Sequence, residues 1–121
     1  MGVIQEPPKA LTDAHVAVVR ELERRGLGVM NEIPFPPYTV DVYVPRFHCA
    51  IEIDGPQHGK TRDEKRDRRL AEEYDLPVFR VKAGEAKRPK KWLPALRDFL
   101  LSAAETADER RSECEQKASW L

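Results

Sequence analysis

The sequence is poor in several features that would each point to a class of protein. It has 2 cysteines, Cys49 and Cys114, which are too few for a disulfide framework or a cysteine-based metal cluster and fit a reducing compartment. No apolar run approaches the roughly 20 residues that span a bilayer. The first ten residues, MGVIQEPPKA, hold no cationic stretch followed by an apolar one. We therefore expect no secretory signal and a cytoplasmic location.

The chain also lacks a net charge, because Lys+Arg 21 balances Asp+Glu 21. Neutrality argues at first against nucleic acid as a partner, since domains that bind it are usually basic. The charge is unevenly placed, however: residues 60–91 carry 12 Lys/Arg and 7 Asp/Glu, a net +5, which leaves −5 on the rest. Such a segment is either a solvated helix face or a stripe that faces phosphates, and both alternatives stay open.

A length of 121 residues bounds the chain to one small domain. A hydrophobic fraction of 40% argues against wholesale disorder, and a charged fraction of 35% argues against a membrane protein. We expect the single domain to cover residues 1–104. Residues 105–121 are highly charged, and we expect either a helical extension or a frayed tail there.

Hydrophobic periodicity predicts seven elements in the order α-β-β-β-α-β-α. Thr12 or Asp13 can cap the first helix, and Gly26 or Gly28 can stop it. The order predicts an α/β fold (an α+β mixed sheet), with a meander of three strands and a crossover helix to a fourth. The expected helices cover 11–25, 62–74 and about 91–104, and the expected strands cover 28–33, 38–44, 48–54 and 77–82.

Alternation along two of these strands predicts which side chains share a face of the sheet. In the 38–44 strand the three valines are expected on one face, and Asp41 is expected on the opposite face. In the 48–54 strand a cysteine and two isoleucines share one face, and two acids share the other. The expected sets are Val40, Val42 and Val44; Cys49, Ile51 and Ile53; and Ala50, Glu52 and Asp54.

Three acids stand where a core would prefer apolar residues: Asp41, Glu52 and Asp54. Adjacent antiparallel strands lie about 4.8 Å apart, so carboxylates on the same face of both strands can converge. Converging like charges are costly unless a cation stabilises them. Carboxylate oxygens suit Mg²⁺ or Mn²⁺ rather than zinc. The alternative is that the acids line a solvated sheet face.

Two histidines lie near these acids in the expected fold. His58 follows Asp54 by four residues, across Gly-Pro. A lone loop histidine is usually a surface residue, but beside clustered acids it becomes a candidate base or ligand of a metal-bound water. His15 lies on the apolar stripe of the first helix, where we expect a hydrogen-bonded core histidine.

Four segments together carry a family resemblance. They resemble the very short patch repair (Vsr-like) endonucleases, and more closely small relatives of these within the restriction-endonuclease-like PD-(D/E)xK superfamily. The likeness covers about residues 11–82, and the joint pattern is fairly specific although each piece alone is weak. The segments are YTVDVYV at 38–44, AIEIDGPQH at 50–58, Asp63-x-x-Arg66-x-x-x-Leu70 and VFRV at 78–81.

The resemblance implies metal-dependent hydrolysis of a DNA phosphodiester bond, with Mg²⁺ or Mn²⁺. Asp41 matches the metal-binding aspartate of the family, and Glu52 and Asp54 match the acids of its E-x-D-G strand. The backbone carbonyl of Ile53 would be a further metal ligand. His58 matches the histidine that would orient or deprotonate the attacking water.

The resemblance also implies roles for the helix that follows. Asp63 and Arg66 match its polar start, where a cation can meet the scissile phosphate or brace the acids. The basic segment would hold the DNA backbone through Lys60, Arg62, Arg66 and Arg69, contacts that carry no sequence information.

Two positions depart from the family pattern. The superfamily's lysine is replaced by Asp54, so His58 or Lys60 must do its work. The glutamate that relatives carry on the first helix corresponds to His15, which leaves the number of metal ions open and places His15 among the catalytic candidates.

The resulting hypothesis is a DNA endonuclease or nickase of repair, recombination or mobile-element biology. Nothing in the chain resembles a sequence-reading element such as a zinc finger, so we expect specificity from DNA structure, a protein partner or a homodimer. The alternatives are a non-catalytic nucleic-acid-binding module of the same fold, a structure-selective junction resolvase, and a protein-interaction subunit that docks through residues 105–121.

Overall fold

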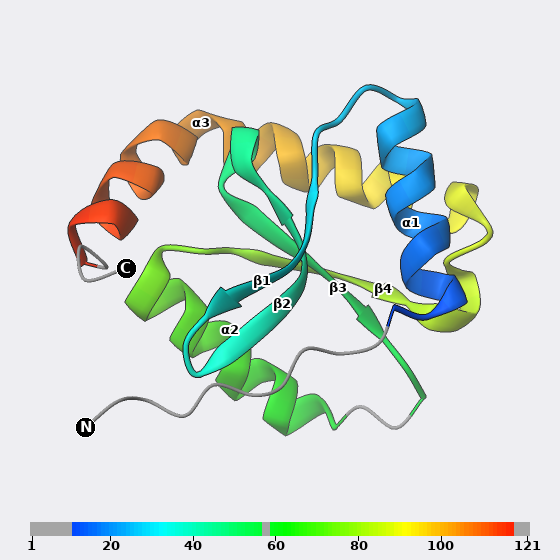
Figure 1. The fold of residues 1–121 in the computed structure, drawn as a ribbon, viewed down its shortest axis with the longest axis horizontal. Coiled ribbons are helices and arrows are strands. Elements are labelled where there is room, and N and C mark those ends of the chain that lie inside the picture. The colour runs from blue at the N-terminus through cyan, green and yellow to red at the C-terminus, as the bar shows by residue number, and fades with distance from the viewer. Residues whose placement is uncertain (1–10, 57–58, 118–121) are drawn as a thin grey trace.

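Three helices and four strands make up the regular structure of residues 11–56 and 59–117, the part of the chain that the computed structural model describes (Figure 1). Their order confirms the α-β-β-β-α-β-α prediction. Short 3₁₀ turns, η1 (Pro45–Phe47), η2 (Ala83–Glu85) and η3 (Pro89–Lys91), connect them. The elements are α1 (Asp13–Arg24), β1 (Met30–Phe35), β2 (Tyr38–Val44), β3 (Cys49–Asp54), α2 (Lys60–Tyr74), β4 (Val78–Lys82) and α3 (Leu93–Lys117).

Helix α1 begins and ends at the predicted signals. The Thr12 side chain accepts a hydrogen bond from the His15 N–H at 3.1 Å, which satisfies one of the free donors of the first turn. Gly26, just after the helix, has a φ of 83°, a left-handed conformation that glycine adopts without strain. Between them, Val18 and Leu22 are buried against the sheet.

The sheet is mixed, with the strand order β1-β2-β3-β4. The β1–β2 and β2–β3 pairs are antiparallel, and β4 lies parallel to β3 after the crossover through α2. Strand β1 covers Met30–Phe35, so the predicted span of 28–33 ended too early, at Pro34. A proline is accepted here because β1 is an edge strand, where one side of the backbone needs no ladder hydrogen bond.

Two clusters of apolar side chains form the core, one on each face of β3. Cys49 and Ile51 belong to the cluster under α1 and the start of α3, and Ala50 belongs to the cluster under α2. The alternation predicted for β3 is therefore confirmed for these residues. The prediction for β2 is wrong at Val40, which joins the α2 cluster while Val42 joins the other.

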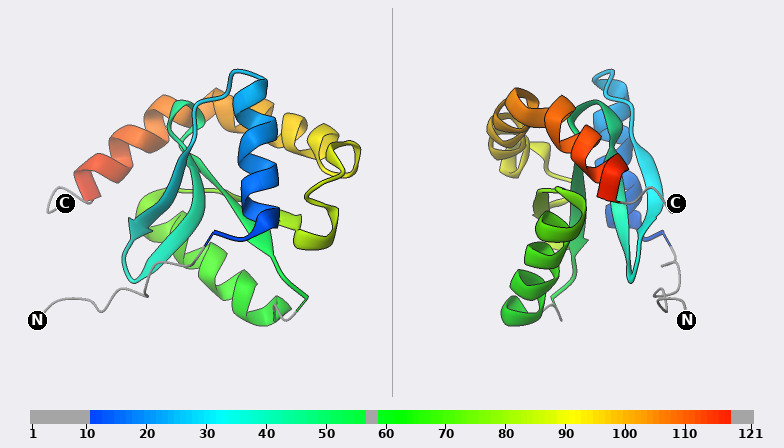
Figure 2. Two further views of the ribbon diagram at one scale, coloured as in Figure 1. Left: turned by 45° about the vertical axis from the view of Figure 1, so that its right-hand side comes forward. Right: turned by 90° about the vertical axis from the view of Figure 1, so that its left-hand side faces the viewer.

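Helix α3 continues far beyond residue 104, to Lys117 (Figure 2). Arg110 holds this part of the helix to the rest of the domain, because it donates to the carbonyls of Phe47, His48, Asp75 and Ala103. Residues 105–117 are thus a packed helical extension. Within the described ranges, no helix combines the length and apolar character needed to cross a bilayer.

Candidate functional site

Asp41 and Glu52 lie where β2 and β3 stop pairing as regular strands. The paired register of β2 against β3 covers Val42–Val44. Before it, the Asp41 N–H donates to Glu52 Oε2 at 2.7 Å, and the Ile53 N–H donates to Asp41 Oδ2 at 2.8 Å. Both acids are buried, Asp41 with 5% and Glu52 with 2% of its surface exposed. The two carboxylates replace ladder hydrogen bonds, so the backbone of the partner strand fixes their position.

Arg66 of α2 reaches into the same region from outside the sheet. Its Nη2 donates to Glu52 Oε1 and to the Thr39 carbonyl, both at 2.7 Å. Its guanidinium lies over the Tyr38 ring, 4.7 Å from the centroid. The Arg66 and Glu52 side chains are 11% and 3% exposed, so this is a desolvated ion pair. Arg66 therefore balances the Glu52 charge and ties α2 to β2 at Thr39 and to β3 at Glu52.

Asp54 belongs to a second cluster, centred on Arg80 of β4. Arg80 Nη1 lies 2.7 Å from Asp54 Oδ1 and 3.6 Å from Asp63 Oδ1, and Arg80 Nε donates to Asp67 at 3.0 Å. Burial opposes the charged form of Arg80, but the hydrogen bond and charge of Asp67 and the charges of Asp54 and Asp63 outweigh it, so the Arg80 pKa is raised. These residues line an open cavity of about 690 Å³, together with Lys60 and others.

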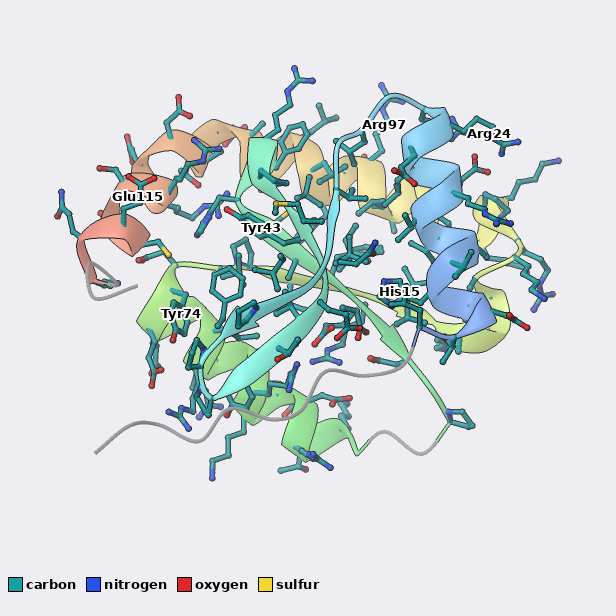
Figure 3. All side chains as sticks on the ribbon, in the orientation of Figure 1. His15, Arg24, Tyr43, Tyr74, Arg97 and Glu115 are labelled. Carbon is teal, nitrogen blue, oxygen red and sulfur yellow. The ribbon has the colours of Figure 1, made fainter. Side chains whose placement is uncertain are left out.

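His15, Glu32 and Asp41 form a third group, which brings α1, β1 and β2 together. One potential ligand atom from each residue lies within 4.8 Å of the others. His15 is 3% exposed and points from α1 toward the strands (Figure 3). Its Nε2 lies 2.9 Å from Asn31 Oδ1, and its Nδ1 lies 3.8 Å from Glu32 Oε1. With Nε2–H donating to Asn31, the lone pair of the neutral ring is on Nδ1, beside the carboxylates.

The β1–β2 hairpin places Glu32 at this site. Its register pairs Phe35 with Tyr38 and Ile33 with Val40, which puts Glu32 opposite Asp41. Glu32 itself has a φ of 53°, in the left-handed region. Glu32 and its neighbour Asn31 are not among the site residues that the sequence predicted. The available signal was the turn at residues 36–37, because a two-residue loop fixes which positions of a hairpin face each other.

The predicted acids thus fall into separate groups. Asp41 joins His15 and Glu32, and its backbone N–H donates to the Glu52 carboxylate. Asp54 and Asp63 lie with Arg80 instead. The oxygens of Glu52 engage Arg66 and the Asp41 N–H. The roles predicted for these residues, including the Ile53 carbonyl as a ligand, remain predictions.

The predicted phosphate-binding cations differ in exposure. Lys60 and Arg62 are exposed on the first turn of α2. Arg69 donates to Glu73 at 3.0 Å and lies over the Tyr38 ring, while Arg66 is partly buried in its pair with Glu52. His58 lies outside the described residues, so its predicted role as base stays a prediction.

His48 is also buried, and its contacts indicate a structural role. Its Nδ1 lies 2.8 Å from the Tyr43 hydroxyl, and its Nε2 lies 2.9 Å from the Tyr74 carbonyl. Figure 3 shows both tyrosines at the end of the sheet away from His15. Burial lowers the His48 pKa, and the hydrogen bond to Tyr74 only partly opposes this shift.

A comparison with solved structures finds the same fold in a chain titled "Homing Endonuclease I-Bth0305I Catalytic Domain". The TM-score is 0.61 and the sequence identity is 16%, and the match covers 76% of this chain and 97% of that chain. No family model and no curated protein matches the sequence. The likeness confirms the nuclease-like mixed α/β core, and the resemblance to Vsr-like enzymes in particular remains a prediction.

Proposed function

We propose that this protein is a metal-dependent DNA endonuclease or nickase that hydrolyses phosphodiester bonds. The single observation that carries the proposal is the His15–Glu32–Asp41 group, whose ligand atoms lie within 4.8 Å of one another on a fold shared with a homing endonuclease catalytic domain. The Vsr-like sequence pattern supports the same activity. A role in repair, recombination or mobile-element biology is part of this proposal.

The donor set fits a divalent cation of the Mg²⁺ or Mn²⁺ type. It offers two carboxylates and one imidazole nitrogen, and Mn²⁺ accepts such a mixed set more readily than Mg²⁺, which prefers oxygen. Asp41, Glu32 and His15 Nδ1 would hold the ion. When bound, it would polarise a phosphoryl oxygen and lower the pKa of a water molecule.

The surrounding residues have positioning roles in this proposal. The Ile53 N–H fixes Asp41, and Asn31 fixes the tautomer and orientation of the His15 ring. Glu52 accepts from the Asp41 N–H, and Arg66 donates to Glu52 and to the Thr39 carbonyl, so together they hold β2 against β3 beside Asp41. The sequence resemblance gives His58 the role of general base, a contribution typically worth about 10²–10⁴ in rate.

DNA would bind through the exposed cations at the start of α2. Lys60, Arg62, Lys65 and Arg68 are all exposed on this helix, and Lys60 lines the same cavity as Asp54 and Asp63. Such contacts position a phosphate backbone without reading its sequence. Sequence specificity would then come from a partner protein, a homodimer or the structure of the DNA.

Nicking of supercoiled plasmid tests the proposal, with Mg²⁺, Mn²⁺ and EDTA as separate conditions. We expect relaxed circles with either metal and none with EDTA. Asp41→Asn keeps an oxygen for the Ile53 N–H but removes the charge, and we expect at least a 100-fold loss of rate. His58→Ala should lose activity to a similar degree, while Glu109→Gln, an exposed acid on α3, should behave as wild type. Full activity of both Asp41→Asn and His58→Ala would refute the proposal.

A second candidate function is a non-catalytic DNA-binding module. The observation that favours it concerns two acids of the expected catalytic strand. Glu52 forms an ion pair with Arg66, and Asp54 forms an ion pair with Arg80. This candidate predicts salt-sensitive DNA binding with no cleavage in either metal. Lys65→Glu would weaken binding in both cases, so cleavage by the wild-type protein is the result that separates them.

A further inference from the structure

A groove beside the C-terminal end of α1 is lined by apolar side chains that the core leaves partly uncovered. Three separate parts of the chain form it: residues 22–27, the η1 turn, and residues 89–101. Its volume is about 610 Å³. Leu27, Phe47 and Leu100 are partly buried against the core from this side, and Leu101 is 58% exposed. The groove therefore extends the hydrophobic core to the surface.

The rim of this groove carries charge of one sign. Arg25, Arg46, Lys90 and Arg97 line it, and the described residues contribute no Asp or Glu to the lining. All four cations are exposed, and the Arg46 guanidinium lies over the Phe47 ring, 5.4 Å from its centroid. Because the whole chain is neutral, a cationic rim around an apolar floor is a local feature. A surface complementary to this groove would be apolar and flanked by carboxylates.

The groove is separate from the candidate metal group. His15 lies in the first turn of α1 and Arg25 follows its last residue, and ten residues of helix span about 15 Å. None of His15, Glu32 and Asp41 lines the groove, so an occupant of the groove need not contact them.

We propose that this groove binds an acidic amphipathic helix of a partner protein. Apolar side chains at helical spacing would cover Leu101 and Phe47, and carboxylates along both edges would meet the four cations. A nucleic acid would satisfy the cations, but its phosphate backbone offers no apolar surface to the leucines. This inference does not depend on the nuclease activity.

A fluorescently labelled synthetic Leu/Glu amphipathic helical peptide is the probe for this proposal, titrated with the full chain and followed by anisotropy. A control peptide of the same length, with Lys in place of Glu, tests the sign of the charge. We expect saturable binding of the Leu/Glu peptide, and binding at least tenfold weaker for the Leu/Lys control peptide. Equal binding of the two peptides, or no saturable binding of the first, would overturn the proposal.

Two pairs of variants locate the binding surface. Leu101→Glu and Arg97→Glu should each weaken binding of the Leu/Glu peptide at least tenfold. The matched controls are Leu11→Glu, which alters a leucine that is 50% exposed away from the groove, and Lys87→Glu. Both should bind as wild type. All four positions are exposed, so the folded structure should survive, which circular dichroism verifies. Groove variants that bind as tightly as the controls would contradict the proposal.

Other occupants give distinct results. A dimer in sedimentation velocity that Leu101→Glu abolishes would assign the groove to a second copy of this chain. Displacement of the peptide by duplex DNA, with loss of DNA binding in Arg97→Glu, would assign it to nucleic acid. Either result would overturn the assignment to a partner helix.

Discussion

Removing the Arg66 guanidinium should destabilise the domain because it breaks an ion pair to the buried Glu52 carboxylate. The replacement Arg66→Met keeps an unbranched side chain that matches the aliphatic part of the arginine. Glu52 is 3% exposed, so water cannot replace the lost partner. Breaking a buried ion pair from one side costs about 3–5 kcal/mol. The variant also loses the hydrogen bond to the Thr39 carbonyl. We expect a loss of about 3 kcal/mol in the free energy of unfolding.

Urea denaturation followed by circular dichroism measures this loss. The matched control is Arg68→Met, an exposed arginine on the same helix, which should change stability by less than about 0.5 kcal/mol. The double variant Arg66→Met/Glu52→Gln removes the buried charge and keeps an oxygen for the Asp41 N–H. It should recover at least about 1 kcal/mol relative to Arg66→Met. Equal stability of Arg66→Met and Arg68→Met would refute the reasoning, as would a double variant less stable than Arg66→Met.

Three further predictions concern groups outside the candidate site. Burial lowers the His48 pKa below its ordinary value of 6.5, so the free energy of unfolding is retained above pH 6.5 and falls as the pH drops below it. The variant His48→Asn should flatten this dependence in urea titrations between pH 7 and 5. Asparagine tolerates the left-handed backbone at this position. An equally steep wild-type and variant profile would contradict this. Burial raises the pKa of the Cys49 thiol to about 12, so Cys49 in a Cys114→Ala variant should react with a disulfide reagent at pH 8 only after unfolding. Rapid reaction of the folded protein would disprove it. Arg110→Met removes donors to four carbonyls and should cost about 2–4 kcal/mol, against less than about 0.5 for the exposed Arg97→Met, both measured by urea denaturation.

Local patterns were sufficient to predict most of the fold. The span of β2, the cap at Thr12 and the crossover through α2 all depend on residues close together in the sequence, and the structure has them as predicted. The extension of α3 was left open, because it depends on Arg110 reaching carbonyls more than sixty residues away, in the η1 region. The error at Pro34 has a similar cause, since periodicity does not tell which strand forms the edge.

The candidate site was harder to predict than the fold. Asp41 and His15 stood out because each is polar within an apolar pattern. The family resemblance names Arg66 as a candidate brace for the acids, but the Arg80 partner of Asp54 lies 26 residues further along the chain, and no local spacing indicates it. Glu32 was missed because its strand was placed without its hairpin register.

Binding of Mn²⁺, followed by electron paramagnetic resonance, tests the central claim that His15, Glu32 and Asp41 hold the metal. The decisive pair of variants is Glu32→Gln, in this group, and Asp54→Asn, in the cluster around Arg80. We predict that Glu32→Gln weakens binding at least tenfold and that Asp54→Asn binds as wild type. Wild-type affinity for Mn²⁺ in Glu32→Gln, together with loss of Mn²⁺ binding in Asp54→Asn, would contradict this claim. That result would place the metal at the E-x-D-G strand instead.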